Sequence, residues 1–349
     1  MPEYSLQVPW LAAPFLALVL VGWSTRWRWL GALVLGGVAS GIGLWKGALI
    51  PSDAVVLLEH GGLGPALAQL SLWTLFAVLL RAGDRPVFRG PPLLIAPVMG
   101  ACMGELGAAA ILSSSARDPK AAARLALAAA GGGMLGRIGD PAILVLWDKG
   151  ISPVVLGLLG LICVAIAAPK PEDMVERGPV DPVIAGTCIA VAGLAVFPGM
   201  VLQGLAVGCG VLLFQLRSGI RRVDPRPLCW MLGVSLTVLV ALSGGVITLA
   251  GLGLEELQEI IGDRIMWALM GAGALMSTLC GGECASLLAE SILSRRPGLQ
   301  SDGLYTALAA GLAVGGLGPL VVAGALKEGL LRWGVQVLAV LGACALVLG

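Results

Sequence analysis

The chain has 349 residues, of which 58% are hydrophobic and only 12% are charged, and its formal net charge is +1. Soluble domains usually carry about 25% charged residues, so this composition excludes an ordinary soluble globular protein. The near-neutral charge gives no reason to expect a nucleic-acid partner. Apolar runs long enough to cross a bilayer recur from end to end, so we expect an all-α polytopic protein of the cell inner membrane, surrounded by lipid.

The apolar segments of the first half follow in chain order: 9–23, 29–50, 64–80, 91–115, 121–147 and 152–168. The first ten residues lack the basic start and the cleavage site of a signal peptide, so the first run is expected to stay as a transmembrane helix. Residues 169–181, PKPEDMVERGPVD, are charged and rich in proline, which predicts a cytoplasmic linker. The linker separates a first half, 1–168, from a second half, 182–349, which again contains six apolar segments. These are 182–198, 199–216, 227–251, 265–294, 303–326 and 333–348.

Residues 91–115 and 265–294 differ from the other apolar segments because Gly and Glu interrupt each of them near the middle. Each is followed by a polar turn. We expect each to form a re-entrant helical hairpin, which enters the membrane and returns to the same side. A non-helical tip at membrane depth is tolerated only where it is buried in protein or lines a wet cavity.

The distribution of Lys and Arg predicts the orientation of the chain. With the N-terminus outside, and five transmembrane helices plus one hairpin in each half, most of these residues fall in inner loops, as the positive-inside rule requires. The acid-rich stretch LEELQEIIGD, residues 254–263, falls in an outer loop, and Arg295 and Arg296 are the exception. Five crossings is an odd number, so the second half is expected to be inverted and the C-terminus also to lie outside.

The two halves align without a gap when the chain is shifted by 178 positions. The matches then include Cys102 with Cys280, Gly104 with Gly282, Glu105 with Glu283, and Pro141 with Pro319. A plain alternative is that the two hairpins share only small-residue packing. Inverted repeats with paired broken elements are typical of secondary transporters, whose binding site lies near the membrane midplane where the repeats meet.

A second broken element follows each hairpin, at 121–147 and 303–326. The first contains GGGMLGRIGDP, in which Gly139 and Pro141 are expected to shape the break. Arg137 and Asp140 stand at helical i, i+3 spacing and are expected to form a charged pair. The second contains GLAVGGLGP, with Gly318 at the place of Asp140, so the charges lie in one half only. The alternative for both is an ordinary proline kink.

Glu105, Glu283 and Asp140 are the expected proton or cation ligands, with Arg137 as the nearby base. A carboxylate inside a bilayer costs about 2.5–3.5 kcal/mol even on the lenient insertion scale, so such residues are functional candidates. Two glutamates close together in a low dielectric cannot both ionise cheaply, so one is expected to hold a proton that a bound cation displaces. This competition predicts cation/proton exchange that needs no cofactor. Glu290, two turns beyond Glu283, either extends a proton path or reaches the wet end of the hairpin.

Several alternatives stay open at this point. A proton-coupled carrier of organic or inorganic anions would use Arg137 for its substrate. Thiolates at Cys102, Cys280 and Cys284 suit soft metals, although a buried Cys is more often a packing residue. A membrane subunit with a degenerate transporter fold would not transport at all. An enzyme is not expected, because the sequence contains neither GxSxG nor HExxH.

The stretch AAAGGGMLGRIGDPAILVLW, residues 128–147, resembles the Ile-Gly-Asp-Pro region of the ion transporter superfamily, which includes arsenite permeases, citrate and dicarboxylate carriers and one class of sodium/proton antiporters. Residues 307–329 are similar to the second copy of that region, shortened after Gly-Gly. The resemblance implies a scaffold domain, a mobile domain holding both hairpins, a homodimer, and elevator-like alternating access that moves protons and a small ion. The hairpin tips of the family typically carry Asn, which this chain lacks throughout, so Glu105 and Glu283 take that place.

Overall fold

The computed structural model describes residue 17 and the ranges 28–47, 63–83, 87–175, 179–197, 199–216, 223–243, 246–293, 302–317 and 326–348. Of these residues, 84% are helical, and they form fifteen α-helices and no β-strand within the described ranges. The predicted all-α class is therefore confirmed. Gly318, Pro319 and, apart from residue 17, the predicted segment 9–23 lie outside the described residues.

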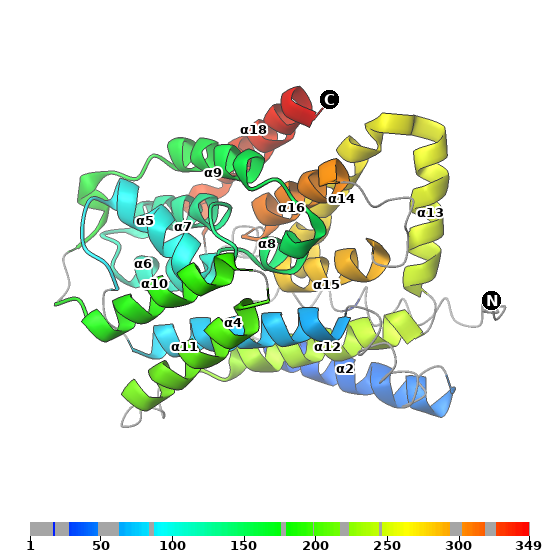
Figure 1. The fold of residues 1–349 in the computed structure, drawn as a ribbon, viewed down its shortest axis with the longest axis horizontal. Coiled ribbons are helices and arrows are strands. Elements are labelled where there is room, and N and C mark those ends of the chain that lie inside the picture. Colours follow the sequence, from blue (N-terminus) through cyan, green and yellow to red (C-terminus); the bar gives the residue numbers. More distant parts are fainter. Residues whose placement is uncertain are drawn as a thin grey trace.

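The helices of the first half are α2 (Arg28–Trp45), α4 (Leu63–Ala82), α5 (Pro92–Met103), α6 (Glu105–Ser114), α7 (Pro119–Gly133), α8 (Pro141–Leu146), η2 (Trp147–Lys149) and α9 (Pro153–Ala167). The linker region holds η3 (Pro171–Asp173). The second half holds α10 (Pro182–Val196), α11 (Val201–Gln215), α12 (Arg226–Ser243), α13 (Val246–Ile261), η5 (Gly262–Arg264), α14 (Ile265–Cys280), α15 (Gly282–Leu293), α16 (Asp302–Gly315), η7 (Lys327–Gly329) and α18 (Leu330–Leu348). Figure 1 shows α5, α6 and α7 at one end of the molecule and α13 and α14 at the other, with α2, α4, α11 and α12 along one side.

Each segment that was predicted to be a hairpin consists of two helices separated by one glycine with a positive φ. In the first segment, Gly104 (φ +82°, ψ 146°) separates α5 from α6. In the second, Gly281 (φ +87°, ψ 154°) separates α14 from α15. These dihedrals lie in a region that essentially only glycine adopts, so the chain can turn there at little cost. The second break therefore falls at Gly281, and the predicted residue, Gly282, is instead the first residue of α15.

Three of the described helices, α2, α4 and α12, are long and apolar enough to cross a membrane. The helices α9, α10 and α11 have 15 residues each. At 1.5 Å per residue they are about 22 Å long, which is shorter than a hydrocarbon core of about 30 Å. Length and composition therefore support a crossing for three of the ten segments that the sequence predicts, within the ranges that the structure covers.

The predicted single segment 227–251 is wrong, because two helices occupy this region. Helix α12 ends at Ser243 and α13 begins at Val246, and the two residues between them are both glycine. Two adjacent glycines lower helix stability by about 1 kcal/mol each relative to alanine. The stretch LEELQEIIGD was predicted to be an outer loop, but its first eight residues belong to α13.

Both glycine-interrupted segments pack closely on the helix that follows them in the chain. Helix α5 packs on α7, where a Cβ atom on Gly132 would overlap the backbone of Pro97. Helix α14 packs on α16, where a Cβ atom on Gly315 would lie 2.5 Å from the carbonyl oxygen of Ala274. Backbones can approach this closely only where the side chain is absent. The same type of small-residue crossing therefore recurs in both halves.

Helix α18 is held to its neighbours by polar side chains that donate to backbone carbonyl oxygens. Arg332 Nη1 donates to Ala167 at 2.6 Å, Trp333 Nε1 to Val314 at 3.0 Å, and Gln336 Nε2 to Cys163 at 2.7 Å. These contacts connect the C-terminal helix with α9 in the first half and with α16 in the second.

The predicted linker is docked on the end of the first interrupted segment. Asp173 Oδ2 accepts hydrogen bonds from Arg124 Nε and from the backbone of Lys170, each at 2.7 Å, and the Asp173 side chain is 1% exposed. The backbone of Val175 donates to the carbonyl of Ser115 at 2.9 Å. The linker therefore bridges α7 and the end of α6 between the two halves.

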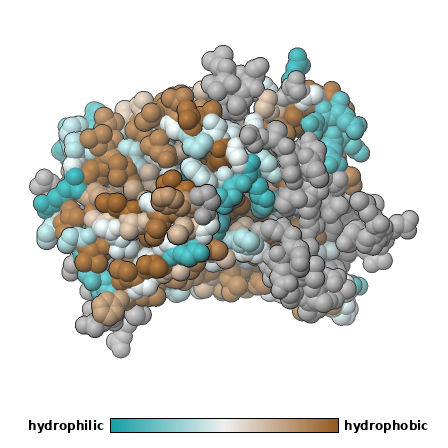
Figure 2. Space-filling model, viewed as in Figure 1, coloured by the Kyte–Doolittle hydropathy of each residue, from teal (hydrophilic) through white to brown (hydrophobic). Residues whose placement is uncertain are grey.

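Large apolar side chains are exposed over much of the surface, as Figure 2 shows for one face. On α9, for example, Val154 is 72% exposed, Leu158 is 54% exposed and Leu161 is 55% exposed. Soluble monomers rarely expose contiguous apolar patches larger than a few hundred Å². This surface is compatible with a membrane protein.

Candidate functional site

The first glycine break lies against the loop that connects α7 with α8. The backbone N–H of Glu105 donates to the carbonyl of Gly139 at 2.8 Å. The indole Nε1 of Trp73, on α4, donates to the carbonyl of Ile138 at 2.7 Å. A Cβ atom on Gly104 would lie 2.6 Å from the Trp73 ring. Two backbone carbonyls of the loop are thereby satisfied by groups from α4 and α6.

Asp140 ends this loop and caps the N-terminus of α8. Its Oδ1 accepts a hydrogen bond from the backbone N–H of Ala142 at 2.7 Å, and Pro141 occupies the first position of the helix. Asp before Pro is a common way to start a helix, because Asp accepts from the free N–H groups and Pro needs no partner. The second oxygen, Oδ2, is buried and has no hydrogen-bond partner among the described residues.

The second glycine break meets the same region from the other half of the chain. A Cβ atom on Gly282 would lie 3.5 Å from Pro141 Cγ and 3.8 Å from the Cα of Gly316, which follows α16. A Cβ atom on Gly316 would in turn lie 2.5 Å from Glu105 Oε1. The start of α8, the end of α16 and both interrupted segments therefore converge at one place.

Three buried carboxyl groups lie around this point of convergence, although they are not arranged to hold one metal ion together. Glu105 and Asp140 are each 1% exposed, and Glu283 is 7% exposed. The carboxyls of Glu105 and Asp140 are close enough to share a hydrogen bond when one of them carries a proton, and Glu283 interacts electrostatically with both. Glu105 Oε2 has no hydrogen-bond partner among the described residues, and the same holds for the buried hydroxyl of Ser277 nearby on α14. We call Glu105, Asp140 and Glu283 the acidic cluster.

The expected pairing of Arg137 with Asp140 is wrong. The Arg137 guanidinium forms an ion pair with Asp148 and lies 5.9 Å from the centre of the Trp147 ring. Its Nη1 also donates to the carbonyl of Ala195 at 3.4 Å. Spacing i, i+3 brings side chains together only on a helix, and residues 134–139 form turns rather than an α-helix. The buried charge of Arg137 is therefore directed to η2 and α10, and Asp140 is left to cap α8.

Three residues at the site were not identified from the sequence. Trp73 lies beneath the first glycine break, and a Cβ atom on Gly281 would lie 3.9 Å from the ring of Trp230 on α12. The guanidinium of Arg28 lies 5.7 Å from the centre of the Trp230 ring, and its charge acts on Glu283. Each break is thus supported by one tryptophan from a long helix. No local pattern around either tryptophan distinguishes it from the other eight in the chain.

The cysteines that were weak candidates for a metal site have other neighbours. Cys280, the last residue of α14, donates to the carbonyl of Met276 at 3.0 Å and lies near Cys284 of α15, whereas Cys102 lies near Cys188 of α10. Within the described ranges, no group of three or more His, Cys, Asp or Glu side chains has the geometry to hold a metal ion. Gly318, the remaining predicted site residue, lies outside these ranges.

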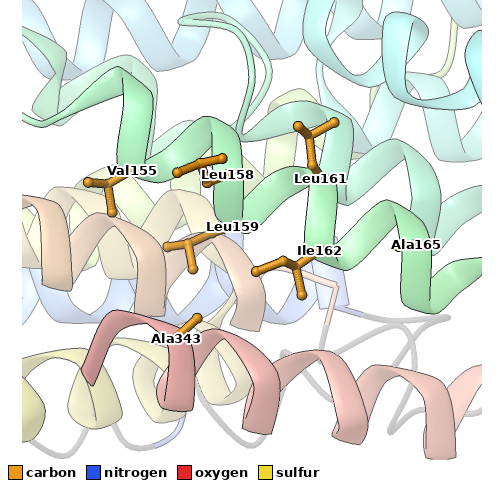
Figure 3. Close-up of a pocket in the computed structure, with 7 residues that line it drawn as sticks. All are labelled: Val155, Leu158, Leu159, Leu161, Ile162, Ala165 and Ala343. Atoms are coloured by element: carbon orange, nitrogen blue, oxygen red, sulfur yellow. The ribbon is translucent and has the colours of Figure 1, made fainter. Parts of the chain in front are cut away.

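A separate hollow of about 420 Å³ lies between α9 and α18. Figure 3 shows that the side chains of its wall come from these two helices, and all of them are apolar: Val155, Leu158, Leu159, Leu161, Ile162, Ala165 and Ala343. Without a polar group to replace bound water, such a hollow is unsuited to an ion.

No protein-family model matches the chain, and no curated protein is significantly similar to it.

The function of the site therefore has to be inferred from its chemistry. Carboxyl oxygens without donors in a buried site bind a proton or a cation, because either one relieves the repulsion between them. Two carboxyls within hydrogen-bonding distance hold one proton between them well. Removal of that proton requires that another positive charge take its place.

Proposed function

We propose that the protein is a proton-linked secondary ion transporter of the inner membrane, and that it exchanges a cation for protons at the acidic cluster. The single observation that carries this proposal is the convergence of Glu105, Asp140 and Glu283, from three separate elements, at two glycine breaks. A transporter needs ligands of this kind on elements that can move relative to each other. We also propose that the two halves are inverted relative to each other and that the N-terminus lies outside.

The recurrence of one local geometry in both halves supports a repeat. Each half has a glycine break with nearly the same dihedrals, a tryptophan against the break, and a small-residue crossing onto the next helix. The resemblance to the ion transporter superfamily predicts the same arrangement from sequence. The two carboxylates at the breaks, Glu105 and Glu283, would face alternate sides of the membrane in turn.

The charge balance of the site favours a cation over an anion. Arg137 could have served an anion substrate, but its guanidinium is engaged by Asp148 and Trp147. The acidic cluster keeps three carboxyls, and Arg28 is the base that acts on Glu283. An anion such as citrate would be repelled by this cluster unless all three carboxyls were protonated.

Reconstitution into vesicles that contain a pH-sensitive dye tests the proposal. Addition of sodium, potassium or lithium outside should move protons. Glu105→Gln and Glu283→Gln, which keep the size of the side chain and remove its charge, should each abolish the signal or shift its pH dependence. Glu172→Gln, at a linker residue whose side chain is 63% exposed, is the matched control and should behave as wild type.

Three outcomes count against the proposal. If both cluster variants retain the signal of the wild type, the acidic cluster does not carry the proton. If folded wild-type protein moves no proton with any of the three cations, while organic anions drive uptake, the anion alternative takes its place. A folded protein that moves neither class of ion would favour the non-transporting subunit.

A further inference from the structure

We propose that Glu290 forms a second cation site, distinct from the acidic cluster, which the ammonium group of Lys149 occupies in this structure. The place of this site in transport rests on the proposed function, whereas the site itself is argued from its own contacts. Lys149 then acts as a tethered cation that a free monovalent cation has to displace.

Glu290 is a buried carboxylate whose charge is balanced by Lys149 but whose second oxygen has no hydrogen-bond partner among the described residues. It lies on α15 and is 3% exposed. Its Oε1 lies 3.0 Å from Lys149 Nζ, while its Oε2 is buried and has no hydrogen-bond partner among the described residues. A buried charge is costly unless it is paired and its remaining lone pairs are satisfied. The unpartnered oxygen is therefore a free ligand for a cation that displaces the ammonium group.

The ammonium group can leave this carboxylate without a change in the fold. The Lys149 side chain is 33% exposed, and its flexible four-carbon stem lets the ammonium turn outward into water. The backbone around it is fixed by other contacts: Asp148 pairs with Arg137, and the backbone N–H of Ser152 donates to Thr306 Oγ1 at 2.9 Å. Release of Lys149 therefore leaves the surrounding backbone in place and leaves Glu290 with one uncompensated negative charge.

The chemistry around Glu290 favours a small, hard, monovalent cation. The ligand that takes the place of one ammonium has to supply one positive charge. The oxygen ligand that the structure places here is the carboxylate of Glu290. Carboxylate oxygens suit hard cations rather than soft metals, and the single charge to be replaced favours a monovalent one. Glu290 follows Glu283 by seven residues on one helix, about 10 Å away on the same face, so a cation released inward approaches the acidic cluster.

Amine labelling of the detergent-purified, full-length protein tests this inference without transport. The protein is exposed briefly to an amine-acetylating reagent in sodium chloride or in choline chloride at equal ionic strength. Acetylation of Lys149 and of Lys170 is then quantified by mass spectrometry. Sodium should raise the labelling rate of Lys149 several-fold and saturably. Lys170, which faces Glu172 at 3.8 Å with both side chains exposed, is the internal control and should not respond.

Variants then separate this inference from the proposed function. Glu290→Gln should make Lys149 react rapidly in either salt. Glu105→Gln should abolish transport or shift its pH dependence but leave the sodium response of Lys149 unchanged. Equal Lys149 labelling of the wild type in sodium, potassium, lithium and choline salts overturns the inference, whatever the transport result. A response of Lys170 equal to that of Lys149 also overturns it, because that would be a general salt effect.

Discussion

The ring of Trp73 occupies the space that a side chain at residue 104 would need. Glycine is therefore required at this position for two independent reasons. Its φ of +82° excludes other residues, and a Cβ atom would lie 2.6 Å from Trp73 Cζ2. The same tryptophan donates to Ile138, in the loop that leads to Asp140. A single side chain thus joins α4, the first glycine break and the position of the acidic cluster.

Gly104→Ala is expected to destabilise the protein by about 2–4 kcal/mol, from backbone strain of about 1–3 kcal/mol together with overpacking against Trp73. The unfolding temperature of the detergent-purified protein measures the effect. The control is Gly210→Ala, on α11, where a Cβ atom meets no neighbour within 4 Å. That change should be neutral or stabilising by up to about 1 kcal/mol. Equal unfolding temperatures for both variants would contradict the assigned role of Gly104.

Substitutions at Asp140 should separate its structural role from its chemical role. Asp140→Asn keeps an oxygen that can cap α8, so stability should be preserved while cation-driven proton movement is lost. Asp140→Ala removes the cap as well and should cost about 1 kcal/mol in addition. Thermal unfolding and vesicle transport of the two variants provide the comparison. Full transport by Asp140→Asn would exclude this carboxyl from the proton site.

A small-residue crossing between α2 and α12 predicts opposite effects for two adjacent glycines. A Cβ atom on Gly36 would lie 2.7 Å from the carbonyl oxygen of Gly233, whereas one on Gly37 meets nothing within 4 Å. Gly36→Ala should therefore cost about 1–3 kcal/mol through separation of the helices. Gly37→Ala should be neutral or slightly stabilising. Thermal unfolding of both variants checks this, and the reverse order would show that α2 presents its other face to α12.

The ion pair between Arg124 and Asp173 predicts how stability depends on pH. Burial of the Asp173 carboxyl opposes ionisation, but the hydrogen bonds from Arg124 and from the backbone of Lys170 outweigh it and lower the pKa of Asp173. A lowered folded-state pKa means that the contribution to stability is complete above the unfolded value of about 3.9 and is lost as pH falls through the lower folded value.

Asp173→Asn should therefore unfold at a lower temperature than the wild type at neutral pH, and this difference should shrink below about pH 4. Thermal unfolding between neutral and acid pH measures it. Glu172→Gln, at the neighbouring exposed side chain, should show no such pH-dependent difference. A constant difference for Asp173→Asn at all pH values would mean that the ionised carboxylate is not what stabilises the linker.

Several features of the fold could be predicted from the sequence because they are local. Long apolar runs predicted the helices, and a Gly within such a run predicted the two breaks, the second to within one residue. Gly139 and Pro141 were predicted to shape a break, and α8 does begin at Pro141, because the fixed φ of proline acts locally, but the capping role of Asp140 was not predicted. The division between α12 and α13 was missed because the two glycines between them lie inside a run that is apolar overall.

Run length, backbone freedom and capping act within a few residues, so the helical class, the apolar surface and the acid-bearing glycine breaks can be predicted from the sequence. The partner of each buried charge depends on how distant helices pack. Arg137 pairs with Asp148 instead of Asp140, and Lys149 pairs with Glu290, which is 141 positions away in the sequence. A buried charge pairs with whatever opposite charge the packing of distant helices brings near.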